Sequence, residues 1–298
     1  MKFQKKIIVE IWENIDLQNM ENTVVIKIVG DLTTNFVGIN ELFKFYNEAK
    51  DYFDYIISID FYHLRWFDAN LSAIFGAMIQ LLINNNNLKF TTDLAFLENR
   101  FDVLFRNGFL NSENYKSDER NSTIAFQNFD QKDKIGFNDY IENNLMHHRG
   151  MPNISDNQSD CILDALNEIF CNIQLHAQTE NDFYVCGQYY PRQSKLIFTM
   201  VDLGKGFLPA IAEKTKNEVH SNYQAIKWAL EKRNTTKKNR PGGLGLFDLN
   251  SYFSTNNGDF QIITGDTFWS KNLENSPMKK QIFSKPFIGT IVNLVFEI

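Results

Sequence analysis

Short β-branched runs alternate with apolar segments of helical period through the first third of the chain. The clearest run, residues 24–29, ends at Gly30 and Asp31, which are typical turn residues. Such alternation predicts an α/β layer structure, because each strand and each helix must bury one face against the other. The other expected strands are 55–59 and 88–91, and the expected helices are 36–49, 71–83 and 94–105.

A polar stretch over residues 111–131, rich in Asn, Ser and Asp, interrupts this pattern. A chain of 298 residues suits one large domain or two ordinary ones, and its 43% hydrophobic content can fill two cores. We therefore predict an N-terminal domain over 1–115, a linker over 116–134 and a C-terminal domain over 135–298.

The C-terminal domain begins with helices and ends with strands, which predicts an α/β sandwich with helices on one face of a mixed sheet. The expected helices are 138–148, 160–178, 222–233 and 244–253. The expected strands are 183–189, 196–201, 260–264 and 290–296.

Charge and cysteine usage exclude several classes of protein. A formal net charge of −6 gives no overall attraction to nucleic acid or to anionic lipid. No run of 18 apolar residues occurs, so no membrane-spanning helix is expected. The chain has three cysteines, Cys161, Cys171 and Cys186, without zinc-ligand spacing, which indicates a reduced, cytoplasmic protein.

The expected helix 160–178 carries two stripes. One is apolar and should pack on the sheet; the other contains Asp164, Glu168, Asn172 and His176, four residues apart. An Asn side chain can offer Mg²⁺ a neutral oxygen, and a carboxylate can orient or deprotonate water. The alternative is an ordinary solvated polar face.

Two glycine-rich loops follow in the same domain. Asp202, Gly204 and Gly206 come directly after a strand, where glycine lets the backbone lie against a ligand. The second loop, residues 241–246, opens a helix, and free N–H groups at a glycine-rich helix start attract anions. Cations able to reach phosphates precede it: Lys232, Arg233, Lys237, Lys238 and Arg240.

In this order the segments resemble the motifs of the GHKL superfamily, the ATPase domains of gyrase, heat-shock chaperones, histidine kinases and mismatch-repair proteins. Residues 166–172 resemble its N-box, 202–206 its first glycine box and 243–246 its second. Residues 287–290, Phe-Ile-Gly-Thr, resemble the closing motif before the last strand. The resemblance covers residues 135–298 and implies a Bergerat-type α/β sandwich that binds ATP with Mg²⁺.

The resemblance also implies roles for the matched residues. Asn172 should ligate Mg²⁺, and Glu168 should position or activate water as the catalytic group. Asp202 should hold the adenine amine, with Thr290 close by through water. The other residues implied to contact the nucleotide are His176, Gly204, Gly206, Lys238, Arg240, Gly242, Gly243, Leu244, Gly245 and Leu246.

Residues 56–71 of the N-terminal domain resemble, less closely, the STAS domain of anti-anti-sigma factors. In that family a strand leads into an Asp-Ser-Ser-Gly-Leu-type helix start that carries the phosphorylated serine. The corresponding segment here is Asp-Ala-Asn-Leu at 68–71, so the serine pair is absent. We expect Asp68 and Ser72 to cap the helix instead.

The resemblance implies a regulatory protein of bacterial-type signalling, in which the nucleotide state controls association with a partner protein or a second copy of the chain. Two alternatives stay open: a serine protein kinase of the anti-sigma type that acts in trans, and a slow ATPase. A histidine kinase is disfavoured, because the segment around His147 and His148 lacks an acidic neighbour.

Overall fold

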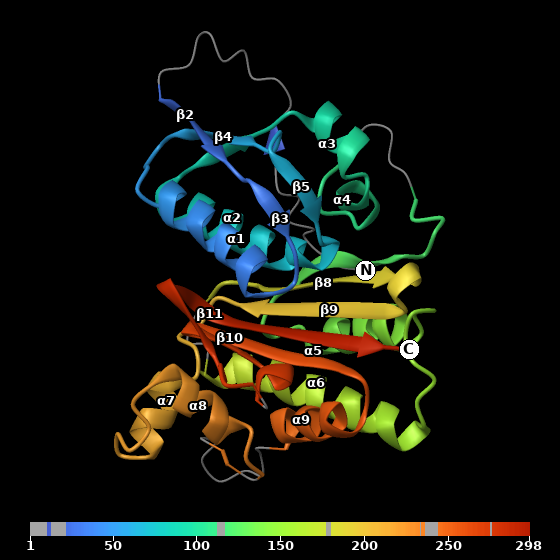
Figure 1. Cartoon of the computed structure of the whole chain (residues 1–298). Helices are drawn as coiled ribbons and strands as arrows, with labels where there is room; N and C mark the ends of the chain where they lie inside the picture. The colour runs from blue at the N-terminus through green and yellow to red at the C-terminus, as the bar shows by residue number, and fades with distance from the viewer. Residues whose placement is uncertain are drawn as a thin grey trace. The chain divides into compact units, whose positions relative to one another are not determined.

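The computed structural model describes residues 11–12, 22–111, 117–176, 180–232, 234–235, 244–274 and 276–298. The chain divides into two compact units: Met1–Asn128 with Tyr184–Gln188 form unit 1, and Phe129–Phe183 with Tyr189–Ile298 form unit 2. The N-terminal half contains parallel sheets with helices, and the C-terminal half contains a five-stranded antiparallel sheet with helices (Figure 1). No helix in the described part of the chain is long and apolar enough to cross a membrane.

Unit 1 is built on a four-stranded sheet in which every described pairing is parallel. Its strands, in spatial order, are β1 (Ile11–Trp12), β6 (Lys89–Thr91), β4 (Ile56–Asp60) and β2 (Thr23–Lys27). A separate parallel pair joins β3 (Gly30–Leu32) to β5 (Leu64–Phe67). The helical elements are α1 (Phe36–Ala49), η2 (Ala69–Leu71), α2 (Ser72–Asn86), α3 (Leu94–Arg100) and α4 (Val103–Arg106).

Local sequence explains where these helices begin and end. α1 starts after Asn35, whose side chain accepts hydrogen bonds from the N–H groups of Val37 and Gly38 at 3.0 and 3.1 Å. α2 ends at Asn87, which takes a left-handed conformation with φ of 51°. The single helix expected over 94–105 is divided into α3 and α4, because Phe101 leaves the helical conformation.

Part of the segment expected to be a linker forms strand β7 (Thr123–Phe129). Ile124 and Phe126 alternate with more exposed residues and are buried, which is the period of a strand with one apolar face. The polar residues on either side of this short alternation conceal it in the sequence.

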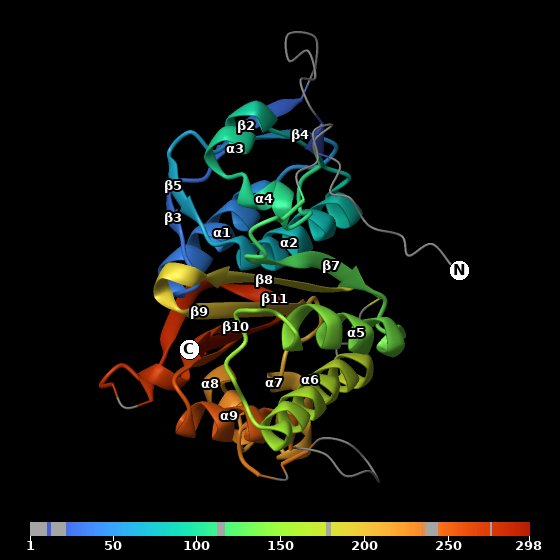
Figure 2. The same ribbon diagram turned by 90° about the vertical axis from the view of Figure 1, so that its right-hand side faces the viewer.

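This strand belongs to the five-stranded antiparallel sheet of the C-terminal half. The strand order of that sheet is β10 (Gly258–Ser270), β11 (Gln281–Glu297), β9 (Lys195–Asp202), β8 (Phe183–Tyr190) and β7. The helices gather on one face of the sheet (Figure 2). They are α5 (Lys134–Tyr140), the π-helix η3 (Ile141–Met146), α6 (Asp156–His176), α7 (Leu208–Lys214), α8 (Asn222–Ala229) and α9 (Gly245–Thr255).

Aromatic rings fill the space between helices and sheet in unit 2. Phe137 of α5 stacks on Phe170 of α6 with ring centroids 4.8 Å apart, and Phe183 of β8 meets both rings edge-on. Phe253 of α9 stacks on Phe260 of β10. Aromatic pairs of this kind bury large apolar areas, so they anchor α6 and α9 to the sheet.

Candidate functional site

A pocket in unit 2 lies between the helix-covered face of the sheet and helices α6, α7, α8 and α9. The sequence places its lining residues in segments far apart along the chain. The pocket nevertheless brings together these predicted site residues: Glu168, Asn172, Asp202, Gly206, Leu246 and Thr290.

Asp202 lies at the end of β9, directly opposite Thr290 of β11 in the antiparallel register. Its Oδ1 accepts a hydrogen bond from the Gly204 N–H at 2.8 Å. Burial raises the pKa of Asp202 from 3.8 to about 6, although hydrogen bonds from Gly204 and Thr290 act in the opposite direction. The carboxylate is therefore costly to ionise here, as is common for groups placed for function rather than for stability.

Two glycines near Asp202 allow neighbouring backbone segments to approach each other closely. Gly289, with φ of 114°, lies so close to the Asp202 carbonyl that a side chain at 289 would collide with it. Gly206, with φ of 71°, lies against the hydroxyl of Thr264 in the same manner. Both positions need a left-handed backbone as well as space, so glycine is required at each for two reasons.

Glu168 of α6 contacts the start of α9. Its Oε2 accepts hydrogen bonds from the N–H groups of Gly245 at 2.6 Å and Leu244 at 3.2 Å. A Cβ at Gly245 would lie only 2.8 Å from the Cβ of Glu168 and 3.0 Å from the carbonyl oxygen of Ala165. The glycine therefore permits α9 to approach α6 closely enough for this contact.

Other carboxylates surround this contact. The pKa of Asp248, in the first turn of α9, is raised by burial, by Glu168 and by Asp164, while Lys232 lowers it. The ammonium of Lys232 also lies 5.5 Å from the centre of the Phe247 ring. The neighbourhood of Glu168 is therefore negatively charged. Among the residues that the structure describes, Lys232 offsets part of this negative charge.

Asn172 lies one helical turn beyond Glu168 and lines the pocket. Within the described part of the chain its amide makes no hydrogen bond, so its oxygen is available to a ligand. No group of three or more His, Cys, Asp or Glu side chains among the described residues can hold a metal ion. An amide oxygen such as that of Asn172 suits Mg²⁺, an ion that typically takes most of its other ligands from phosphate and water.

The remaining predicted residues have different positions. Gly204 donates its N–H to Asp202, and Leu244 and Gly245 donate theirs to Glu168; the pocket lining includes none of the three. Outside the described residues are Lys238, Arg240, Gly242, Gly243 and the side chain of His176.

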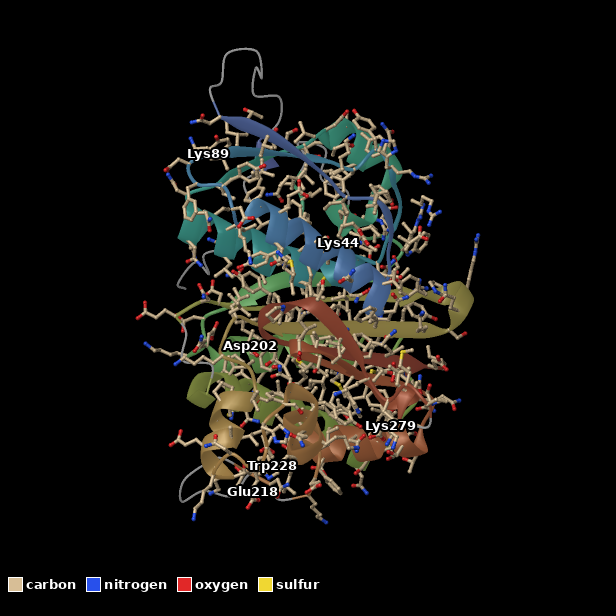
Figure 3. The ribbon with its side chains drawn as sticks, turned by 60° about the vertical axis from the view of Figure 1, so that its left-hand side comes forward. Lys44, Lys89, Asp202, Glu218, Trp228 and Lys279 are labelled. Carbon is tan, nitrogen blue, oxygen red and sulfur yellow. The ribbon has the colours of Figure 1, made fainter. Side chains whose placement is uncertain are left out.

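Sequence reasoning missed the apolar walls of the pocket. The pocket that holds Asp202 is also lined by large apolar side chains. Among them are Phe207 at the start of α7, Trp228 of α8 and Met200 of β9. Figure 3 labels Asp202 and Trp228, which belong to the sheet and to the helical layer of unit 2. The available signal was Phe207 directly after the first glycine box; nothing in the sequence distinguished Trp228 from an ordinary core residue.

The helix start resembling a STAS phosphorylation site is buried in unit 1. Ser72 is fully buried, and its Oγ accepts a hydrogen bond from the Asn107 amide at 3.0 Å. Asp68 occupies the N-cap position of η2, as expected, but neither η2 nor α2 has a side-chain cap hydrogen bond, and the N-cap of α2 is Leu71 rather than Ser72. The Asp68 carboxylate instead accepts from the Thr34 N–H and the Trp66 indole, both at 2.7 Å.

Comparisons of the chain with protein-family models, with curated proteins and with solved structures found no match. Any functional conclusion therefore depends on the motifs and on the geometry of the pocket.

Proposed function

We propose that unit 2 binds ATP with Mg²⁺ in the manner of the GHKL superfamily, as part of a regulatory protein. One observation carries the proposal. A single pocket is lined by residues from all four motifs: Glu168 and Asn172, Asp202 and Gly206, Leu246, and Thr290. Four motifs that are distant in the sequence would not be expected to meet by chance in one apolar cavity with a buried carboxylate.

Asp202 would select the base. An ionised carboxylate only accepts hydrogen bonds, so it complements the N6 amine of adenine and repels the O6 of guanine. The apolar walls formed by Phe207, Trp228 and Met200 suit the faces of a purine ring and exclude water from this contact. Thr290, directly opposite Asp202, holds the carboxylate in place by hydrogen bonding.

Asn172 would supply the protein's oxygen to Mg²⁺, which offsets the negative charge of the phosphates when it is bound. Glu168 lies one turn away on the same face of α6 and lines the same pocket, so both groups face the space where phosphates would lie. Lys232 provides positive charge near the start of α9.

Under this proposal unit 2 is a Bergerat-type sandwich and unit 1 is a STAS-like layer, with the nucleotide state controlling association with a partner protein or a second copy. Ser72 is buried and hydrogen-bonded, so it is inaccessible to a kinase, which supports the absence of a phosphorylation switch at this helix start. Regulation would then depend on the nucleotide bound to unit 2.

Competition calorimetry with ATP and GTP tests the proposal on the full chain. We expect ATP to bind in preference to GTP, and Asp202→Asn to weaken ATP binding and reduce the preference. Asp259→Asn is the matched control, because Asp259 is also a buried carboxylate of unit 2 with a raised pKa but binds Ser270 and Gln261 outside the pocket. Equal binding of ATP and GTP, or equal losses in both variants, would contradict the proposal.

A further inference from the structure

We propose that Glu168 is an internal competitor of the nucleotide's phosphates. Its carboxylate accepts hydrogen bonds from the first N–H groups of α9, and a triphosphate must displace it to use them. The inference rests on the proposed function and adds a regulatory device to the same site.

The contact has the geometry of a bound anion. Two successive N–H groups, those of Leu244 and Gly245, converge on one oxygen, Oε2 of Glu168, at 3.2 and 2.6 Å. Such N–H groups have no partner within their own helix and favour negative charge. Here the protein supplies that negative charge from α6, and the same Glu168 side chain lines the pocket.

A phosphate cannot join the carboxylate at this position without cost. Burial raises the pKa of Asp248, and the charges of Glu168 and Asp164 raise it further, so both carboxylates repel Asp248 at the start of α9. A phosphate placed on the same N–H groups would add charge to this cluster. If the phosphate replaces the Glu168 carboxylate on these N–H groups, less negative charge gathers there than if both anions stay.

The exchange would couple phosphate binding to the contact between two helices. A Cβ added to Gly245 of α9 would lie 2.8 Å from the Cβ of Glu168, so the two helices meet directly at this point. Loss of the Glu168 hydrogen bonds removes a polar link between α6 and α9 when phosphates bind. Adenosine, which has no phosphate, would fill the base pocket without breaking that link.

Calorimetric titration of the full chain with adenosine and with ATP, both in the presence of Mg²⁺, tests the proposal. Glu168→Gln keeps the size of the side chain but removes the charge. It should raise the ratio of ATP affinity to adenosine affinity by about tenfold, the scale of one charge-assisted hydrogen bond. Asp164→Asn is the control, because it removes an equal charge from the same helix without touching the α9 N–H groups. It should change the ratio by no more than about twofold.

A ratio that is unchanged or lowered in Glu168→Gln, or raised equally in Asp164→Asn, would refute the internal competitor while leaving ATP binding intact. Absence of adenosine and ATP binding to the unmodified chain would instead refute the proposed function, and this inference with it.

A second measurement needs no variant. Hydrogen exchange at Leu244 and Gly245 should change with ATP and not with adenosine, and an equal response to both would also refute the competitor.

Discussion

Replacing Asp202 with Asn should make the nucleotide-free protein more stable, and bound ATP should remove most of that advantage. The reason is the pKa of Asp202, which burial raises from 3.8 to about 6. A shift of about 2 pKa units corresponds to about 3 kcal/mol of folding free energy that ionisation of this group costs above pH 6. Asn is neutral, and its oxygen can still accept the Gly204 N–H, so Asp202→Asn should recover about 1–3 kcal/mol at pH 7.

The sign follows from which state binds the proton more tightly. Because the folded pKa lies above the unfolded one, the wild type is most stable with respect to this group below about pH 4 and loses that stability as the pH rises to about 6. The advantage of Asp202→Asn should therefore be largest at pH 7 and should disappear near pH 4. ATP should remove most of this advantage at pH 7, because the Asn variant loses a charge-assisted hydrogen bond of about 1.5–3 kcal/mol.

Amide hydrogen exchange in β9 and β11 is the suitable assay, because it reports the stability of unit 2 without requiring the whole chain to unfold in one step. Exchange should be measured at pH 4 and pH 7, with and without ATP, and corrected for intrinsic rates. A variant that is less stable than the wild type by the same amount at both pH values would show that Asp202 is not a strained ionised group. The reasoning would then be refuted.

Three further predictions concern single residues. Asn172→Ala should weaken Mg²⁺-dependent ATP binding but leave adenosine binding unchanged in calorimetry, and equal ATP affinities would remove Asn172 from the site. Gly289→Ala should destabilise the protein by about 3 kcal/mol or more in urea unfolding, because it adds a clash with the Asp202 carbonyl to the strain of a positive φ. The control Gly30→Ala also has a positive φ but open space around it, so it should cost about 1–2 kcal/mol. Equal costs for the two variants would contradict the clash. ATP should change the tryptophan fluorescence of the wild type but not that of Trp228→Phe, and a response that survives the substitution would place the indole away from the ligand.

Much of the secondary structure was predictable from the sequence because periodicity is a local property. The strand expected at 196–201 and the helix expected at 160–178 correspond to β9 and α6 within a few residues. Strand β7 was missed because its alternation is short and surrounded by polar residues, and only pairing within a sheet reveals it.

The candidate site required the tertiary structure. The sequence supplied the residue types, including an Asp after a strand, an Asn and a Glu on one helical face, and glycines in two loops. It contained no information on register, and it is the antiparallel pairing of β9 with β11 that puts Thr290 opposite Asp202. The approach of α9 to α6 at Gly245 likewise decides that the Glu168 carboxylate binds backbone N–H groups.

The physical reason for this division is the range of the interactions involved. Helical and strand periods depend on neighbouring residues, so the sequence alone determined many of the elements and the kinds of side chain available for a site. Burial, by contrast, depends on every segment that packs around a group. Only the folded chain decided that Asp202 would be a carboxylate with a pKa of about 6.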